Sequence, residues 1–316
     1  MNKRDVMLSL LDENQNQALP YVPAAFFLHF GAPYLLGRAA VDKHLEYFHA
    51  TGMDFVKIQY EKSFPQLPDI VKPEDWAKMP LYGRDFYEEQ LEVVAGLIAA
   101  AKKDALVIVT LYSPFMCAGH TTSHAALTDH LNRDPEAVRR GLEVITDSLM
   151  IFVRACIELG VDGFYHSTQG GEAGHFQHKD TFEKYIKPYD LRLMTEINQR
   201  RPFNILHVCD YAMPYDDFSP FLDYPGQIVN CPLDLGDKKL TPREAAQMFK
   251  RPYMGGLERK GELATGKPEQ IPELVEAVLR DAPDRFILGA DCTVPGDTPW
   301  ANLRRAIDTA HAYQRS

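Results

Sequence analysis

Short runs of apolar residues alternate along the chain with longer stretches in which apolar residues recur every three or four positions. The short runs have the length of buried strands, and the longer stretches are typical of helices that bury one face. The predicted strands are Val22–His29, Phe55–Tyr60, Ala105–Tyr112, Gly163–Ser167, Phe203–Cys209, Gln227–Cys231, Pro252–Leu257 and Phe286–Ala290. The predicted helices are Asp42–Thr51, Tyr87–Lys103, Pro135–Leu159, Thr181–Gln199, Thr241–Phe249, Pro268–Arg280 and Pro299–Tyr313.

Several helix starts are marked by a polar residue directly before a proline. Proline is well tolerated in the first turn of a helix, and the preceding polar side chain can cap the free backbone N–H groups. The pairs Asp134-Pro135, Thr241-Pro242 and Thr298-Pro299 have this form. Each pair therefore predicts the beginning of a helix.

The order of these elements favours a (β/α)8 barrel, the TIM-barrel architecture, over an open sheet. Eight strands separated by helices, without an internal repeat or a low-complexity linker, match the α/β class with a closed parallel sheet. The chain has 316 residues, and such barrels commonly run past about 250 residues as one domain. We therefore expect a single TIM-barrel domain over residues 1–316.

Composition and charge argue against several classes of partner. The formal net charge of -10 offers no basic face to a nucleic acid, and no segment approaches the ~20 apolar residues of a membrane span. The apolar stretch near the N-terminus is soon interrupted by Asp12 and Glu13, so it does not predict a signal peptide. Five cysteines, an odd number, predict free thiols or metal ligands in a reducing cytoplasm.

The most informative motif is His207-Val-Cys209, which closes one predicted strand, together with Cys292, which follows another. Residues two apart in a strand project to the same side, so His207 and Cys209 can hold one ion while Cys292 arrives from another strand end. Imidazole and thiolate are ligands that zinc prefers. Cys231 ends the sixth predicted strand and is a candidate fourth ligand. The alternative is a core histidine with small buried thiols.

This ligand set constrains the reaction. One neutral histidine and two thiolates formally cancel the double charge of zinc, so such a site activates water less than a three-histidine site does. A thiol bound at an open position would still lose its proton and remain nucleophilic, which favours alkyl transfer to sulfur. If Cys231 also binds, the site could instead be closed and structural.

Two further groups of polar residues follow predicted strands. His166, Gln169 and Glu172 lie at and after the fourth strand, beside a glycine pair, and His166 or Glu172 could accept a proton or anchor a substrate. A solvated loop explains them equally well.

Cys117, His120 and His124 follow the third strand, where lining a pocket is a better expectation than a second metal. Cys156, within a predicted helix, is expected in the core.

The sequence resembles the uroporphyrinogen decarboxylase superfamily, in its zinc-dependent branch of methylcobamide:thiol (coenzyme M-type) methyltransferases. The resemblance extends over nearly the whole chain and includes Asn2-Lys-Arg-Asp-Val-Met-Leu-Ser-Leu-Leu, Tyr112-Ser-Pro-Phe-Met, Thr181-Phe-Glu-Lys-Tyr-Ile-Lys-Pro-Tyr and Leu288-Gly-Ala-Asp-Cys-Thr-Val-Pro. It implies a zinc ion on His207, Cys209 and Cys292, a methylated corrinoid as methyl donor, a corrinoid-binding protein as partner and a small thiol as acceptor. Cobalamin-independent methionine synthases share this zinc arrangement, but two barrels and a much longer chain are expected of them.

The departures from the decarboxylases of this superfamily are equally informative. Those enzymes carry an arginine-rich loop after the first strand, where this chain has Leu28-His-Phe-Gly-Ala-Pro. They also carry an aspartate near the end of the second strand, which Phe55–Tyr60 lacks. Without these arginines a tetrapyrrole would lose its bidentate carboxylate partners. In the methyltransferase branch a glutamate often ends the sixth strand, where Cys231 and Asp234 are the nearest residues here. A decarboxylase or lyase acting on a small acid is the alternative function.

Overall fold

Seven parallel strands form the centre of the molecule in the computed structural model, which describes residues 2–12, 19–178 and 180–314. The sheet has the order β1-β2-β3-β4-β5-β8-β9, so strands that follow one another along the main chain are neighbours in space. The strands are β1 Phe55–Ile58, β2 Leu106–Tyr112, β3 Gly163–Thr168, β4 Ile205–Val208, β5 Ile228–Asn230, β8 Tyr253–Leu257 and β9 Phe286–Ala290. A separate small hairpin pairs β6 Asp234–Leu235 with β7 Lys238–Lys239.

The eighth position of the barrel is taken by an irregular segment, not by the regular strand predicted over Val22–His29. Only Ala24 forms a strand-like bridge, to Leu288 of β9. On that side Leu288 N–H donates to the Pro23 carbonyl (2.8 Å), and on the other side Asp54, just before β1, donates to the Ala24 carbonyl (3.0 Å). The segment therefore joins the two edge strands and closes the ring of a (β/α)8-type barrel. Pro23 has no N–H to donate, which helps to explain why regular pairing fails here.

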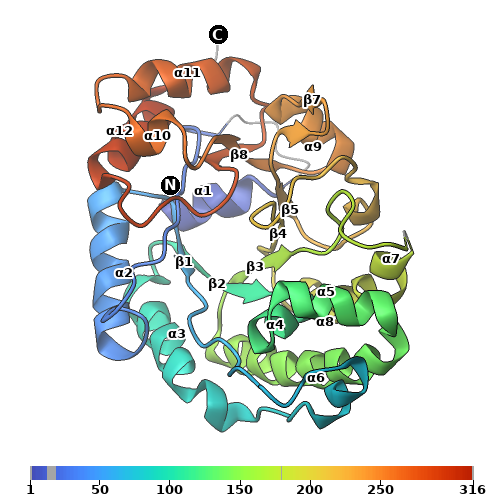
Figure 1. The fold of residues 1–316 in the computed structure, drawn as a ribbon. Coiled ribbons are helices and arrows are strands. Elements are labelled where there is room, and N and C mark those ends of the chain that lie inside the picture. Colours follow the sequence, from blue (N-terminus) through green and yellow to red (C-terminus); the bar gives the residue numbers. More distant parts are fainter. Residues whose placement is uncertain (1, 13–18, 179, 315–316) are drawn as a thin grey trace.

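Helices surround the strands in chain order (Figure 1), as βα units with parallel strands require. Helix α12 at the end of the chain packs beside α2, which completes the outer ring. Helix α1 lies near the amino ends of the strands, where Arg4 N–H donates to the Asp104 carbonyl (3.1 Å) just before β2. The helices are α1 Lys3–Ser9, α2 Gly37–Thr51, α3 Glu88–Ala101, α4 Pro114–Thr121, α5 His124–Arg133, α6 Pro135–Leu159, α7 Thr181–Tyr185, α8 Lys187–Arg200, α9 Pro242–Phe249, α10 Glu262–Thr265, α11 Ile271–Asp281 and α12 Trp300–Ala312, with 3-10 turns η1 Pro73–Lys78, η2 Arg84–Tyr87 and η3 Ser219–Phe221.

The helix-start signals have mixed outcomes. Asp134 caps α6 by accepting from Ala137 N–H (3.1 Å), and Thr241 caps α9 by accepting from Glu244 N–H (3.2 Å). Thr298 does not cap a helix, because Pro299 occupies the cap position of α12 and no side-chain hydrogen bond is made there.

One predicted helix is divided, and four short helices, α1, α4, α5 and α10, were not predicted. The helix predicted over Thr181–Gln199 breaks at Ile186 into α7 and α8, because Pro188 has no N–H for continuous helical bonding. The short helices α4 and α5, which follow β2, were absent from the sequence-based prediction.

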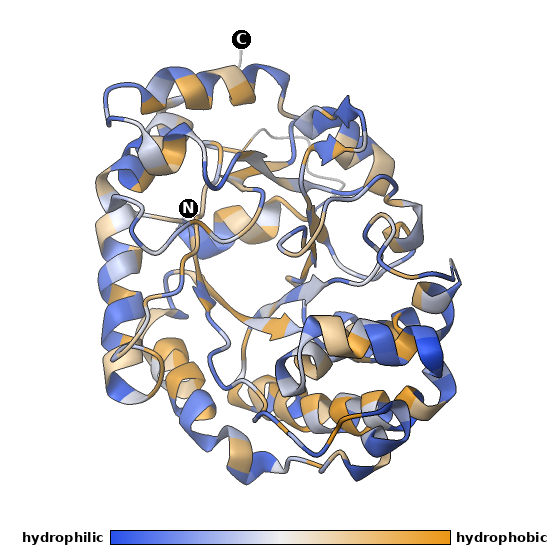
Figure 2. Ribbon diagram, viewed as in Figure 1, coloured by the Kyte–Doolittle hydropathy of each residue, from blue (hydrophilic) through white to orange (hydrophobic). Residues whose placement is uncertain are grey.

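Aromatic side chains fill the barrel interior towards the amino ends of the strands. The ring of Phe55 packs edge-on against Phe27 and Phe203, with ring centroids 5.5 Å away in both cases. The outer helices carry hydrophobic and hydrophilic residues side by side, as helices that bury one face do (Figure 2). Within the described residues, no helix combines the length and apolar character needed to cross a membrane.

Candidate metal centre and active site

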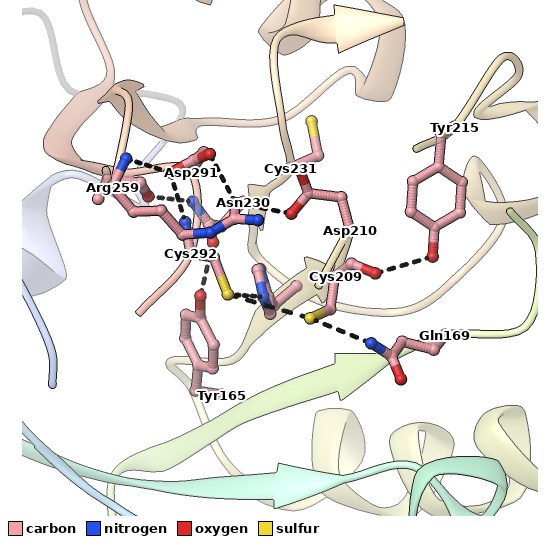
Figure 3. Close-up of polar contacts among 12 residues, drawn as sticks. Tyr165, Gln169, Cys209, Asp210, Tyr215, Asn230, Cys231, Arg259, Asp291 and Cys292 are labelled. Atoms are coloured by element: carbon pink, nitrogen blue, oxygen red, sulfur yellow. Dashed lines mark hydrogen bonds and ion pairs between the residues drawn. The ribbon is translucent and has the colours of Figure 1, made fainter. Parts of the chain in front are cut away.

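His207, Cys209 and Cys292 meet at the carboxyl ends of the strands, where barrels of this type carry their chemistry. His207 lies in β4, Cys209 directly follows that strand, and Cys292 lies two residues after β9. Cys292 Sγ is 3.4 Å from His207 Nε2 and 4.0 Å from Cys209 Sγ (Figure 3), and all three ligand atoms lie within 4.8 Å of one another. Because β5 and β8 separate β4 from β9 in the sheet, the three side chains approach one another across the barrel mouth.

These separations fit a tetrahedral zinc ion. With Zn–S bonds of about 2.3 Å and Zn–N bonds of about 2.0–2.1 Å, tetrahedral angles place two sulfurs roughly 3.8 Å apart and a sulfur and a nitrogen roughly 3.5 Å apart. The observed 4.0 Å and 3.4 Å are close to both values. Three protein ligands on zinc leave a fourth position for water or substrate, which is the pattern of catalytic sites.

The pKa values of the two thiols in this group are shifted in opposite directions. The hydrogen bond from Cys209, together with the nearby His207, holds the pKa of Cys292 well below its usual range. The same contact and burial raise the pKa of Cys209 well above it. A thiolate is therefore favoured within this pair, and Gln169 Nε2 lies 3.5 Å from Cys209 Sγ as a further polar contact. The protein thus prepares negative charge at a position where a cation would bind.

His207 is oriented by packing. Its ring lies 4.9 Å from the ring of Tyr165 at an interplanar angle of 30°. Tyr165 is in turn fixed by donating to Asn230 Oδ1 (2.5 Å). Within the described residues, His207 Nδ1 has no hydrogen-bond partner, so the ring's contact with Tyr165 sets its orientation.

A cavity of about 450 Å³ opens beside the three ligands. Its lining includes Cys209, Cys292 and Arg259, together with Tyr112, His120 and His124. Its volume falls in the range of small-molecule sites. The cavity therefore places a small substrate next to the candidate metal ligands.

Lys57 on β1 supplies a buried amino group to this cavity. Its Nζ donates to Gln59 Oε1 (2.8 Å) and Thr110 Oγ1 (3.0 Å) and lies 4.7 Å from the centre of the Tyr165 ring. Among the described residues, no carboxylate forms an ion pair with Lys57, and burial lowers its pKa to about 7. Sequence reasoning gave Lys57 no role at the metal site, although a lysine within the predicted buried strand Phe55–Tyr60 is itself a sign of a buried amino group.

Cys117, His120 and His124, which follow β2 (the third predicted strand), do not form a second metal site among the described residues. His120 and His124 line the cavity, as predicted for pocket residues, whereas Cys117 is fully buried in the core. Burial lowers the pKa of both histidines and raises that of the Cys117 thiol. Among the described residues, His207, Cys209 and Cys292 form the single group of three or more such side chains whose ligand atoms are close enough to share an ion.

The structure does not place His166 in the cavity. Successive side chains of a strand alternate in direction, and because Tyr165 and Ser167 line the cavity, His166 points outward to helix α8. There its Nε2 lies 3.7 Å from Asp190 Oδ1, with both side chains buried.

Glu172 is also absent from the cavity lining. Its Oε2 accepts from Gly170 N–H (2.7 Å) and lies 3.0 Å from His175 Nδ1. Its observed contacts hold the loop after β3 together. Gln169 is the residue of that loop that reaches the cavity.

Cys231 lies outside the group of three ligands. The preceding residue, Asn230, points inward and donates to the Met254 and Ala290 carbonyls, so alternation turns Cys231 to the other side. Figure 3 shows its sulfur directed away from Cys209 and Cys292. Burial raises the pKa of the Cys231 thiol, as for a core residue. Cys156 is likewise fully buried, as expected.

Comparison with known proteins gives a family match over most of the chain. Residues 45–313 match the uroporphyrinogen decarboxylase (URO-D) family. A methylated-thiol–coenzyme M methyltransferase of Methanosarcina mazei is 23% identical over 260 residues. That match covers 79% of this chain and 66% of the relative, slightly less than two thirds of the relative's length.

Solved structures share the fold. A methyltransferase from Methanosarcina mazei superimposes with a TM-score of 0.77 at 13% identity, covering 98% of each chain. A B12-independent methionine synthase from Shewanella sp. W3-18-1 gives a TM-score of 0.57 at 10% identity, covering 92% of this chain and 97% of that one. This second structure is matched over nearly its whole length, so a methionine synthase of this kind can be about as short as the present chain. The expectation that such enzymes have two barrels and a much longer chain therefore does not hold for this one.

Proposed function

This chain belongs to the uroporphyrinogen decarboxylase (URO-D) family, and we propose that it is a zinc-dependent methyltransferase that moves a methyl group from a methylated corrinoid to a thiol. The observation that carries the proposal is the meeting of His207, Cys209 and Cys292 beside a cavity at the barrel mouth. The corrinoid is proposed to arrive on a corrinoid-binding protein, as the resemblance to the methylcobamide:thiol methyltransferases implies.

His207, Cys209 and Cys292 would hold the ion. A bound zinc would lower the pKa of an incoming thiol and keep its sulfur nucleophilic. Cys209 and Cys292 bring two negative charges, which suits activation of a thiol better than activation of water. In the balanced transfer the carbon–cobalt bond of the donor breaks, its electron pair stays on the corrinoid, a carbon–sulfur bond forms and the thiol proton is released.

Other side chains of the cavity would assist this reaction. Tyr165 keeps the His207 ring in place through their 4.9 Å ring contact. Lys57, without an acidic partner among the described residues, would stabilise negative charge on a sulfur that approaches the site. His120 and His124, which burial favours in their neutral form, offer hydrogen bonds to the remainder of the substrate.

The same cavity is a poor match to tetrapyrrole decarboxylation. The loop after the first barrel segment presents His29, and β1 presents Lys57 in the region where the decarboxylases are expected to carry aspartate. Arg259 is already paired with Asp210 and Asp291, so it does not replace the missing arginines as a free carboxylate binder.

The proposal is tested by metal analysis and a methyl-transfer assay. Protein purified without added zinc should contain about one zinc per chain, and methylcobalamin should serve as a slow substitute donor to a suitable thiol. Uroporphyrinogen serves as the contrasting substrate, and no product above a heat-inactivated control is expected from it. Absence of zinc from the purified protein, or failure of methyl transfer across a panel of small thiols, would overturn the proposal.

A further inference from the structure

Each candidate cysteine ligand has an aspartate directly beside it in the chain, as Cys209-Asp210 after β4 and as Asp291-Cys292 after β9. Both aspartates face one arginine, Arg259, which follows β8. Arg259 Nη1 donates to Asp210 Oδ1 (2.8 Å) and to Asp291 Oδ2 (2.7 Å), as Figure 3 shows. A single nitrogen therefore bridges the two segments that carry the ligand sulfurs.

Asp291 is fixed at its second oxygen as well. Asp291 Oδ1 accepts from the backbone N–H of Arg259 (2.7 Å) and from the backbone N–H of Cys292 (3.0 Å). This carboxylate thus links the backbone of the segment after β8 to the backbone of one ligand. The side chains of Arg259, Asp210 and Asp291 are only 13%, 19% and 16% exposed, so their charge-assisted bonds are partly shielded from water.

We infer that Arg259 is a positioning residue that holds Cys209 and Cys292 at the separation a metal ion requires, before the ion arrives. Strands β4 and β9 are not neighbours in the sheet, so no ladder of hydrogen bonds between them fixes the distance between their end segments. The arginine bridge provides that connection, and the two sulfurs lie 4.0 Å apart. The inference rests on the proposed metal site and goes beyond it by assigning the residue that assembles the site.

The consequence for affinity follows from preorganisation. Residues that orient metal ligands typically contribute about 10- to 100-fold to metal affinity. Removing the bridge should release the two segments from one another without removing any ligand atom. Zinc binding should therefore weaken although all three ligands remain.

The test compares Arg259→Met with Arg4→Met in the full chain. Arg4 forms a similar, partly buried pair with Asp162 (2.7 and 2.8 Å), but at the amino end of β3, away from the cavity. Zinc affinity is measured by competition with a chelator. After zinc removal, the pairing of the two thiols is measured with phenylarsine oxide, whose arsenic bonds two neighbouring thiols with loss of water. Cys209→Ser gives the background of that reaction.

Arg259→Met should weaken zinc binding about 10- to 100-fold and weaken arsenical binding several-fold, while Arg4→Met leaves both unchanged. Wild-type arsenical affinity in Arg259→Met would overturn the inference, because the thiols would then remain paired without the bridge. If the wild type binds the arsenical but not zinc, the proposed function fails. The arsenical affinity of Arg259→Met relative to the wild type then still shows whether Arg259 holds the two thiols together. Should Arg259→Met not fold, Asp210→Asn takes its place under the same criteria.

Discussion

The sulfur atoms of Cys209 and Cys292 lie 4.0 Å apart although 83 positions separate the two residues in the chain. Each reaches the barrel mouth from the end of its own strand, and His207 Nε2 completes the group. The ligands thus come from three side chains at the mouth, while the aromatic core lies deeper in the barrel. Metal binding and folding should therefore be separable by mutation.

Cys209→Ala should remove most of the zinc and leave a cooperative unfolding transition. Cys231→Ala is the matched comparison, because Cys231 is a fully buried cysteine outside the ligand group. It should keep its zinc and lose roughly 1–2 kcal/mol of unfolding free energy through the cavity left in the core. Metal content and urea denaturation of both variants check this pair of outcomes. Stoichiometric zinc in a Cys209→Ala, Cys292→Ala double variant would contradict the assignment of ligands.

Replacing His166 and replacing His120 should have different consequences. His166 faces Asp190 outside the cavity, so His166→Ala should lower stability and leave the KM for the thiol nearly unchanged. His120 lines the cavity, so His120→Ala should raise that KM, by roughly 10-fold if one hydrogen bond to the substrate is lost. Steady-state kinetics with methylcobalamin as donor, together with thermal unfolding, distinguish the two effects. An unchanged KM in His120→Ala would remove that residue from the substrate site.

Whether a candidate side chain reaches the cavity depends on which face of its strand it projects from. The strands of a parallel barrel are buried on both faces, so their hydrophobic pattern does not reveal which alternate residues point inward. The proximity of His207 and Cys209 could be predicted, because residues two apart in a strand project to the same face, whether that face is the inner or the outer one. His166 and Cys231 could not be assigned, because each depends on knowing that its neighbour, Tyr165 or Asn230, faces the interior.

Long-range contacts account for the rest of what the sequence did not reveal. The ring of strands was predictable from their alternation with helices, but the irregular closing segment near Ala24 depends on bonds to residues far along the chain. The bridge through Arg259 was missed for the same reason. The sequence did contain a sign of this bridge, because each candidate cysteine has an adjacent aspartate, Asp210 or Asp291. Two carboxylates that lie close together are stabilised by a cation between them, which here is Arg259.

Lys57 should make stability depend on pH. Burial lowers its pKa to about 7, and attraction to Cys292 and Glu61 offsets burial only in part. Between pH 7 and about 10.4 the unfolded chain binds more protons at this residue than the folded protein does. The destabilising contribution is thus complete below pH 7 and falls as pH rises, by at most about 1.4 kcal/mol per pH unit.

Lys57→Met should consequently gain stability relative to the wild type at pH 6 and lose this advantage towards pH 10. The lost bonds to Gln59 and Thr110 add a constant offset that does not depend on pH. Urea unfolding of zinc-free protein at several pH values gives the difference between the two chains, in which the titration of all shared groups largely cancels. A difference that stays constant with pH would show that Lys57 is not held neutral by burial.

A suitable thiol should bind at the candidate metal centre and release a proton near neutral pH. With zinc bound, the three protein ligands would leave one position open. The thiolates of Cys209 and Cys292 would cancel the formal charge of the ion, and an incoming thiol would bind more tightly after losing its proton. Zinc X-ray absorption should therefore count two sulfurs in the resting protein and three when the thiol is present. Calorimetry in buffers of different ionisation enthalpy should report the released proton. A resting count of three that does not rise with thiol would mean that another sulfur, with Cys231 the obvious candidate, has moved into the fourth position. Zinc would then have a structural role, and methyl transfer to thiols should be absent as well.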